Sequence, residues 1–301
     1  MNEIFADRSL FSLAVKFLGL AFATGWAVAY YSRERSSGLY WLRCLEFLLA
    51  IIAWGMLSWA LFSRGSECGR LPLANIFEVF QSLGWCALFF VVFLRAVWNL
   101  RVPVFLGSGL ALGLCVLGQM NAENWDKVVV AGDAGAASPW IGVHATLSTV
   151  GYACFSAAAT VWVLYILQNS ALRKRFSHPF FSKLPDLSSL DRIAGRLCAS
   201  GLMILGTGMA VGIASVFFSE KQYSCFVFYK TGISFAVFLG FLTLALLRNR
   251  GSISALKFAR FGVGIFIAAL ILLGGSACIK NWEAGALPDG TCAEKTGGLG
   301  R

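Results

Sequence analysis

Few side chains in this 301-residue chain could bind a metal ion or carry out acid–base chemistry. There are two histidines, His144 in the segment PWIGVHATLSTVGYA and His178 in a basic segment. A neutral imidazole can bind a metal through one nitrogen while its other nitrogen hydrogen-bonds to a neighbour. The basic surroundings of His178 are typical of a solvated loop, so His144 is the candidate ligand. A histidine that only packs between helices is the alternative interpretation of His144.

A second polar group lies in the otherwise apolar segment GRLPLANIFEVFQSLGW, where Asn75 and Glu78 are one helical turn apart. Pro72 suits the start of a helix. Inside a membrane, a carboxylate is costly unless it has a partner. We therefore expect Glu78 to make a functional or structural polar contact, with Arg70, Lys230 or a ligand. A carboxylate that merely extends to the membrane interface is the alternative.

The composition shows which elements must position these groups. Hydrophobic residues make up 58% of the chain and charged residues 13%, and the mean hydropathy is +0.72. Soluble domains are roughly half apolar and a quarter charged. So few charges cannot coat a soluble globule, which excludes a soluble enzyme and a disordered or nucleic-acid-binding chain, despite the formal net charge of +10. We predict an all-α, polytopic helical membrane protein.

Eight apolar segments approach the length of about 20 residues that a membrane-spanning helix needs. They lack the period-2 alternation of membrane β-strands. The first segment has no cleavage site typical of a signal peptide, so we expect it to be retained. The predicted spans are residues 9–31, 40–62, 73–98, 102–120, 140–168, 193–218, 227–247 and 258–279.

The charges of the connecting segments alternate along the chain. The first, third, fifth and seventh connections, with their flanks, hold fifteen of the 25 lysines and arginines but four of the 15 acidic residues. The positive-inside rule therefore predicts that these connections face the cytoplasm and that both termini face outward from a bacterial inner membrane. We interpret the net positive charge mainly as a topology signal and as contact with anionic membrane lipid.

The sixth predicted span begins with charged residues and continues with glycines. We expect Asp191 at the N-terminus of this helix, where a carboxylate is favourable, and Arg192 and Arg196 as structural cations. The glycines have a spacing that allows close helix packing. They are Gly201, Gly206, Gly208 and Gly212.

Four of the nine cysteines fall on the predicted outer side, where an oxidising compartment could join them as two disulfides in any of three connectivities. They are Cys68, Cys225, Cys278 and Cys292. A C-x-x-C pair, a phosphate-binding loop, a zinc spacing and a Ser/His/Asp set are all absent from the sequence. We therefore name no catalytic residue, and the sequence leaves open whether the chain is an enzyme or part of a haem-attachment complex.

Several segments, in chain order, resemble the cytochrome c assembly proteins of the CcsA/ResC group and their HemX-like relatives. Gly69–Glu78 looks like the family segment P-x-S-N-L-x-E, and Trp140 with His144–Tyr152 looks like its tryptophan, outer histidine and glycine-tyrosine helix. Leu190–Gly212 looks like its L-D-x-x-x-x-R helix. The resemblance covers residues 65–280. Residues 1–64 would add two transmembrane helices, and 281–301 a flexible outer tail.

The resemblance implies a haem held at the outer face, with His144 as iron ligand and Trp140, Tyr223 and Phe226 beside it. Asn75 and Glu78 would line an outer vestibule. The tryptophan-rich loop of the family, with its W-D-P-K-E-T core, is not retained, since residues 219–231 read SEKQYSCFVFYKT. The histidine that the family carries at the end of the next span is also missing, so this chain alone does not predict a bis-histidine site.

Two functions remain in view. The first is a haem-handling role in cytochrome c biogenesis, in which the protein presents or relays haem to apocytochrome c beside a second membrane subunit of a haem-attachment complex. The alternative is a HemX-like accessory or regulatory subunit that binds no haem. A small-molecule transporter is less favoured, because the sequence shows neither inverted repeats nor paired charges at mid-depth.

Overall fold

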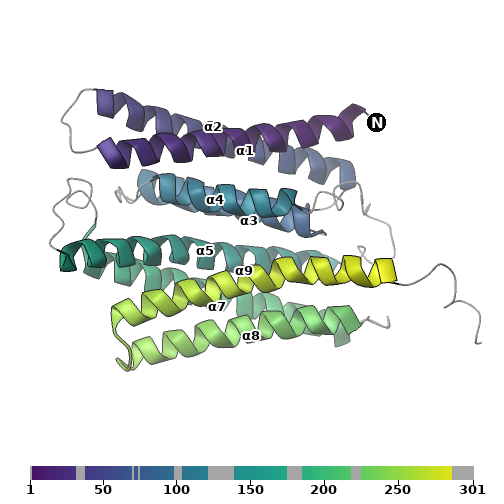
Figure 1. Cartoon of the computed structure of the whole chain (residues 1–301). Coiled ribbons are helices and arrows are strands. Elements are labelled where there is room, and N and C mark those ends of the chain that lie inside the picture. Colours follow the sequence, from purple (N-terminus) through teal and green to yellow (C-terminus); the bar gives the residue numbers. More distant parts are fainter. Residues whose placement is uncertain are drawn as a thin grey trace, which may run out of the picture.

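In the computed structural model, the described residues are 2–31, 38–69, 71–73, 75–97, 104–120, 139–174, 185–217 and 225–286, and their regular structure is entirely α-helical. The helices run back and forth along one bundle (Figure 1). Among the described helices, seven are long and apolar enough to cross a membrane. This confirms the predicted polytopic helical membrane fold. The helices are α1 (Asn2–Tyr31), α2 (Gly38–Cys68), α3 (Ile76–Val97), α4 (Val104–Gln119), α5 (Pro139–Arg173), α7 (Leu187–Phe217), α8 (Cys225–Asn249) and α9 (Ala255–Ala286).

The start of α1 and the end of α9 lie at the same end of the bundle (Figure 1). We call this the outer end, following the charge-based prediction, and the opposite end the inner end. The predicted cytoplasmic connections all leave from the inner end. The direction in which the bundle faces in its membrane stays a prediction.

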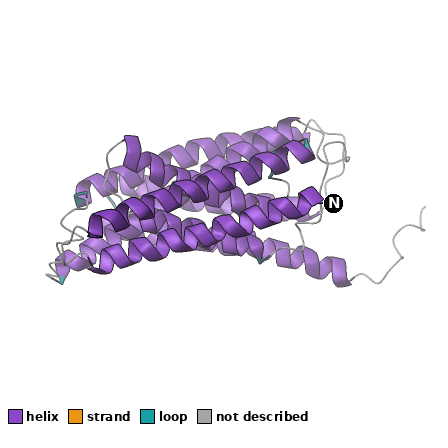
Figure 2. Ribbon diagram, turned by 90° about the horizontal axis from the view of Figure 1, so that it is seen from above, coloured by secondary structure: helices purple, strands orange, loops and turns teal. Residues whose placement is uncertain are grey.

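The bundle contains two hydrophobic cores. One is built from α1–α4, and the other from α5, α7, α8 and α9. The helices run nearly along one direction (Figure 2). α3 packs against α5, and Tyr152 of α5 and Leu110 of α4 contact both cores. The two groups of four helices are therefore joined along α3, α4 and α5.

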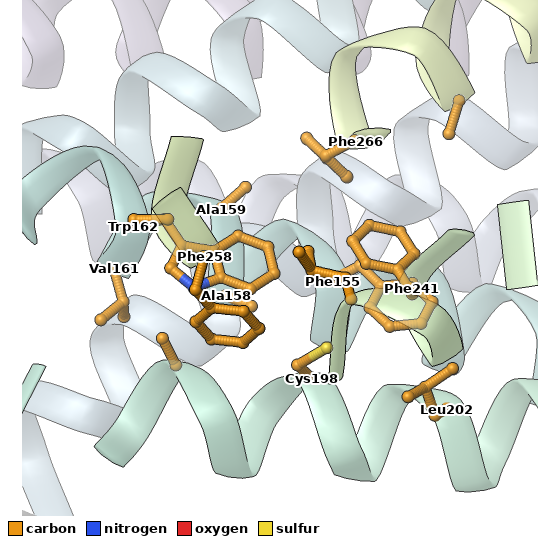
Figure 3. Close-up of a cluster of buried hydrophobic side chains, with 14 of the residues drawn as sticks. Phe155, Ala158, Ala159, Val161, Trp162, Cys198, Leu202, Phe241, Phe258 and Phe266 are labelled. Atoms are coloured by element: carbon orange, nitrogen blue, oxygen red, sulfur yellow. The ribbon is translucent and has the colours of Figure 1, made fainter. Parts of the chain in front are cut away.

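The second core contains a group of aromatic side chains that contact one another (Figure 3). Phe155 of α5 stacks on Phe241 of α8, and Trp162 stacks on the same ring while meeting the Phe258 ring edge-on. These four side chains are at most 2% exposed. α5 is the most buried of the candidate spans. It therefore provides a rigid support for the side chains at its outer end.

Exposed aromatic side chains mark the depth of the membrane on α2. Tyr40 and Trp41 are exposed near the inner end, and Trp59 and Phe62 near the outer end. Aromatic residues favour the two membrane interfaces. The helix between these pairs covers roughly 27–33 Å at 1.5 Å per residue, which matches a hydrocarbon layer of about 30 Å.

The short helix α4 begins against a buried carboxylate. Its 16 residues extend about 24 Å, less than the thickness of the hydrocarbon layer. Glu46 of α2 is 4% exposed and hydrogen-bonds the backbone of Phe105 in the first turn of α4. Gly25 of α1 leaves the space, because a Cβ there would lie 2.4 Å from the Cβ of Phe105. Glu46 thus satisfies a helix N-terminus that lacks partners of its own.

Asp186, rather than Asp191, lies at the N-terminus of α7. The Asp186 carboxylate accepts hydrogen bonds from the Ser188 hydroxyl and the Ser189 backbone N–H. Asp191 lies further along the helix and forms an ion pair with Arg248 of α8. The expectation for Asp191 was wrong because α7 starts at Leu187, with a polar turn before its apolar run.

The Asp186 cap should make the stability of α7 depend on pH. Hydrogen bonds from Ser188 and Ser189 lower the pKa of Asp186 from 3.8 to about 2. A carboxyl with a lowered folded-state pKa stabilises the helix above its unfolded pKa, and this stabilisation is lost as the pH falls towards 2. Ser188→Ala should move the titration midpoint of Asp186, followed by carboxyl carbon NMR, back towards 3.8. A midpoint unchanged by Ser188→Ala would contradict this cause.

Candidate functional site

His144 lies in the second turn of α5 and contacts α7. Its Nδ1 atom lies 2.7 Å from the carbonyl oxygen of Gly208. A carbonyl oxygen only accepts hydrogen bonds, so Nδ1 carries the hydrogen. In the neutral ring, Nε2 then keeps a free lone pair. The half-buried imidazole is therefore oriented with its second nitrogen available as a ligand.

Glycines of α7 create the space that the His144 ring occupies. A Cβ on Gly212 would lie 2.5 Å from His144 Nδ1, and a Cβ on Gly208 would lie 3.1 Å from the backbone nitrogen of Ser148. Further along the same interface, Gly201 lies against Phe155. The predicted close packing of the α7 glycines is therefore observed against α5, whereas Gly206 faces Phe238 of α8.

Glu78 forms a buried ion pair with a residue that sequence reasoning missed. The Nε atom of Arg64 lies 2.7 Å from Glu78 Oε1, and the two side chains are 3% and 0% exposed. Arg70 and the side chain of Lys230, the partners considered from the sequence, lie outside the described residues. The pair contributes a polar contact near the outer end, as expected for Glu78. It does not lie at mid-depth, where transport sites are typically found.

Asn75 positions Glu78 from the start of α3. The side-chain oxygen of Asn75 accepts a hydrogen bond from the Glu78 backbone N–H at 2.8 Å. Asn75 therefore caps α3, and Glu78 occupies the third helical position, where a carboxylate is favourable. The one-turn spacing of these residues in the sequence reflects this cap.

Two further polar side chains extend this group, which we call the outer polar cluster: Arg64, Asn75, Glu78, Gln81 and Ser82. Gln81 is fully buried, and its Nε2 atom donates to the carbonyl oxygen of Cys115 on α4 at 3.0 Å. Ser82 donates to the Pro72 carbonyl at 3.4 Å. The cluster thus ties together the outer ends of α2, α3 and α4. His144 lies on α5, which packs against α3.

The other predicted site residues are only partly described. Trp140 lies one turn before His144 and is 64% exposed. Phe226 lies in α8 without a described side chain, and Tyr223 lies outside the described residues. The aromatic surroundings of His144 therefore stay a prediction. Within the described ranges, no group of three or more His, Cys, Asp or Glu side chains could hold a metal ion.

The predicted outer disulfides also remain predictions. Cys68 is buried at the end of α2. Cys225 and Cys278 belong to α8 and α9, but their side chains are not among those described, and Cys292 lies outside the described residues.

No family model and no solved structure matches the chain. Among curated proteins, it is similar to protein HemX of Brevibacillus brevis, with 23% identity over 56% of this chain and 61% of the relative. Protein HemX of Bacillus subtilis (strain 168) shows 21% identity over 61% of this chain and 63% of the relative. An uncharacterized 28.8 kDa protein in the nifR3-like 5' region of Azospirillum brasilense shows 27% identity over 72% and 77%.

The chain thus spans about three fifths of the length of the two HemX proteins. These weak similarities support the HemX-like part of the resemblance seen in the sequence. They do not extend to the CcsA/ResC group. The chain is therefore a multi-pass helical membrane protein that is similar to HemX proteins.

Proposed function

We propose that this protein binds haem at the outer end of its bundle, with His144 as the axial ligand from this chain. The supporting observation is the hydrogen bond between His144 Nδ1 and the Gly208 carbonyl. Histidines that bind metals commonly donate their other N–H to a backbone carbonyl, which fixes the ring and raises the basicity of the ligating nitrogen. The donor chemistry of His144 therefore fits a haem iron. The similarity to HemX proteins agrees with a role in the haem pathway.

Other residues of the chain would orient the haem and shield it. Trp140 lies one turn from His144 on α5 and offers an exposed aromatic face. Tyr223, from the connection before α8, and Phe226, from the first turn of α8, would complete the aromatic surroundings. The outer polar cluster would hold the ends of α2, α3 and α4 in place beside this site. When bound, haem would supply the vinyl groups to which the thiols of an apocytochrome add.

The finer role that we propose is presentation of haem to apocytochrome c, beside a second membrane subunit of a cytochrome c assembly complex in a bacterial inner membrane. This role rests on the resemblance of Gly69–Glu78, His144–Tyr152 and Leu190–Gly212 to the CcsA/ResC group. The chain itself would bind and orient haem, and the second subunit would complete the iron coordination.

The loss of the family's tryptophan-rich loop at residues 219–231 favours the second function, a HemX-like accessory subunit without haem. The same His144–Gly208 hydrogen bond joins α5 to α7 where their backbones are close. A histidine that only packs between helices would make this contact equally well. In that case the protein would co-purify with a haem-pathway enzyme and carry no haem.

An absorption spectrum of the purified protein separates the two functions. Protein extracted from haem-replete membranes should show a Soret band, and His144→Ala should reduce its haem content by at least tenfold. His178→Ala removes the other of the two histidines and serves as the matched control, which should keep the band. Wild-type protein without haem would contradict the proposed function and support the accessory role.

A further inference from the structure

The inner end of α5, α7, α8 and α9 carries a large excess of positive charge. These four helices pack in a ring, α5 on α7, α7 on α8, α8 on α9 and α9 on α5. The described residues at this end include two acidic side chains, and one of them, Asp191, is paired with Arg248. The other, Asp186, caps α7. The exposed cations are Arg173, Lys174, Arg192, Arg196, Arg250, Lys257 and Arg260.

Arg192 and Arg196 differ from the others in their position. They lie one turn apart on the exposed face of α7, so both guanidinium groups can reach one anion. Because Asp191 is held by Arg248 on α8, the nearest carboxylate in the sequence already has a partner. Guanidinium groups bind phosphate oxygens through two parallel hydrogen bonds, which suits a phosphate between the two side chains.

The same face of α7 continues along the apolar part of the helix, and among the described residues its side chains at helical spacing stay exposed. A Cβ added at Gly195 would meet nothing within 4 Å. Towards the outer end, the exposed side chains at helical spacing are Ala199, Met203, Thr207 and Ala210, and Met203 is 67% exposed. An acyl chain could lie along this surface, which is mostly apolar and formed largely by small side chains. The two arginines are therefore at the level where a lipid head group meets its hydrocarbon chains.

We propose that Arg192 and Arg196 form a binding site for the phosphate of an anionic phospholipid, with an acyl chain along the Met203 face of α7. The proposal goes beyond the general preference of cytoplasmic loops for positive charge. That preference treats each exposed cation alike. A specific site places most of the affinity on two of the seven exposed cations that are described at this end of the four helices. It does not depend on whether the outer end binds haem.

The test compares two double variants of the full chain in detergent. Arg192→Gln/Arg196→Gln removes the proposed site. Arg173→Gln/Lys174→Gln removes two exposed cations from the same end of the bundle and is the matched control. Phosphatidylglycerol binding is measured by native mass spectrometry, and the helix content of each variant is checked by circular dichroism.

The site variant should bind phosphatidylglycerol about thirtyfold more weakly, the loss expected for two cation contacts of ordinary strength. The control should stay within about threefold of the wild type. Equal losses in both variants, or no loss in the site variant, would overturn the proposal. Competition by millimolar inorganic phosphate would also overturn it, because the site would then take a free anion rather than a lipid.

Discussion

Glu78→Gln should lower the free energy of unfolding by about 3–5 kcal/mol, the cost of breaking a buried ion pair by removing one of its charges. Arg64 would keep its charge in a site where its side chain is 3% exposed. Arg64 and Glu78 join α2 and α3 at the same depth, near their outer ends. Without this ion pair, the outer ends of the two helices should move apart. Reversible unfolding in mixed micelles, followed by circular dichroism, measures this change.

Two further variants show whether the pair itself causes the loss. Glu67→Gln changes an exposed carboxylate near the same end of α2 and should alter the free energy of unfolding by less than about 0.5 kcal/mol. Arg64→Met/Glu78→Met replaces both charges by apolar side chains and should recover most of the stability. A double variant no more stable than Glu78→Gln would contradict the assignment of the loss to the broken ion pair.

Gly212→Ala should have the second largest effect, through its contact with His144. The new methyl group would lie 2.5 Å from Nδ1 of the imidazole, so the ring or the helix must move. We expect a destabilisation of about 1–3 kcal/mol, as for an overpacked core. Under the proposed function, haem content should fall as well, because the ring would leave the Gly208 carbonyl.

The same helix provides the control for this change. Gly195→Ala adds a methyl group that meets nothing within 4 Å. Its stability should match or slightly exceed that of the wild type, because alanine favours the helix over glycine. If both alanine variants unfold alike, the tight contact between α5 and α7 at His144 is not present in solution.

The local features of the fold could be predicted from the sequence. Long apolar runs predict the membrane-spanning helices, since each run must satisfy its backbone hydrogen bonds within one helix. The spacing of Asn75 and Glu78 indicates a helix start, which the cap on α3 explains. The start of α7 was missed, because its first turn is polar and lies before the apolar run.

Contacts between helices could be predicted less well. Arg64 and Glu78 lie on either side of the short α2–α3 connection, four residues before the end of α2 and two after the start of α3. Their similar distance from the connection places both side chains at the same depth, and this was the sequence feature that could have indicated the ion pair. The Gly208 carbonyl gave no such signal, because its position opposite His144 depends on the register of α5 against α7.

The central claim is that the Nε2 atom of His144 binds haem iron, and imidazole rescue tests it most directly. His144→Gly removes the ligand and leaves a space that free imidazole can enter. We expect a weakened Soret band in this variant that returns when imidazole is added, with no such response in His178→Gly. A wild-type protein that carries no haem, or a His144→Gly variant with a full Soret band before imidazole is added, would contradict it.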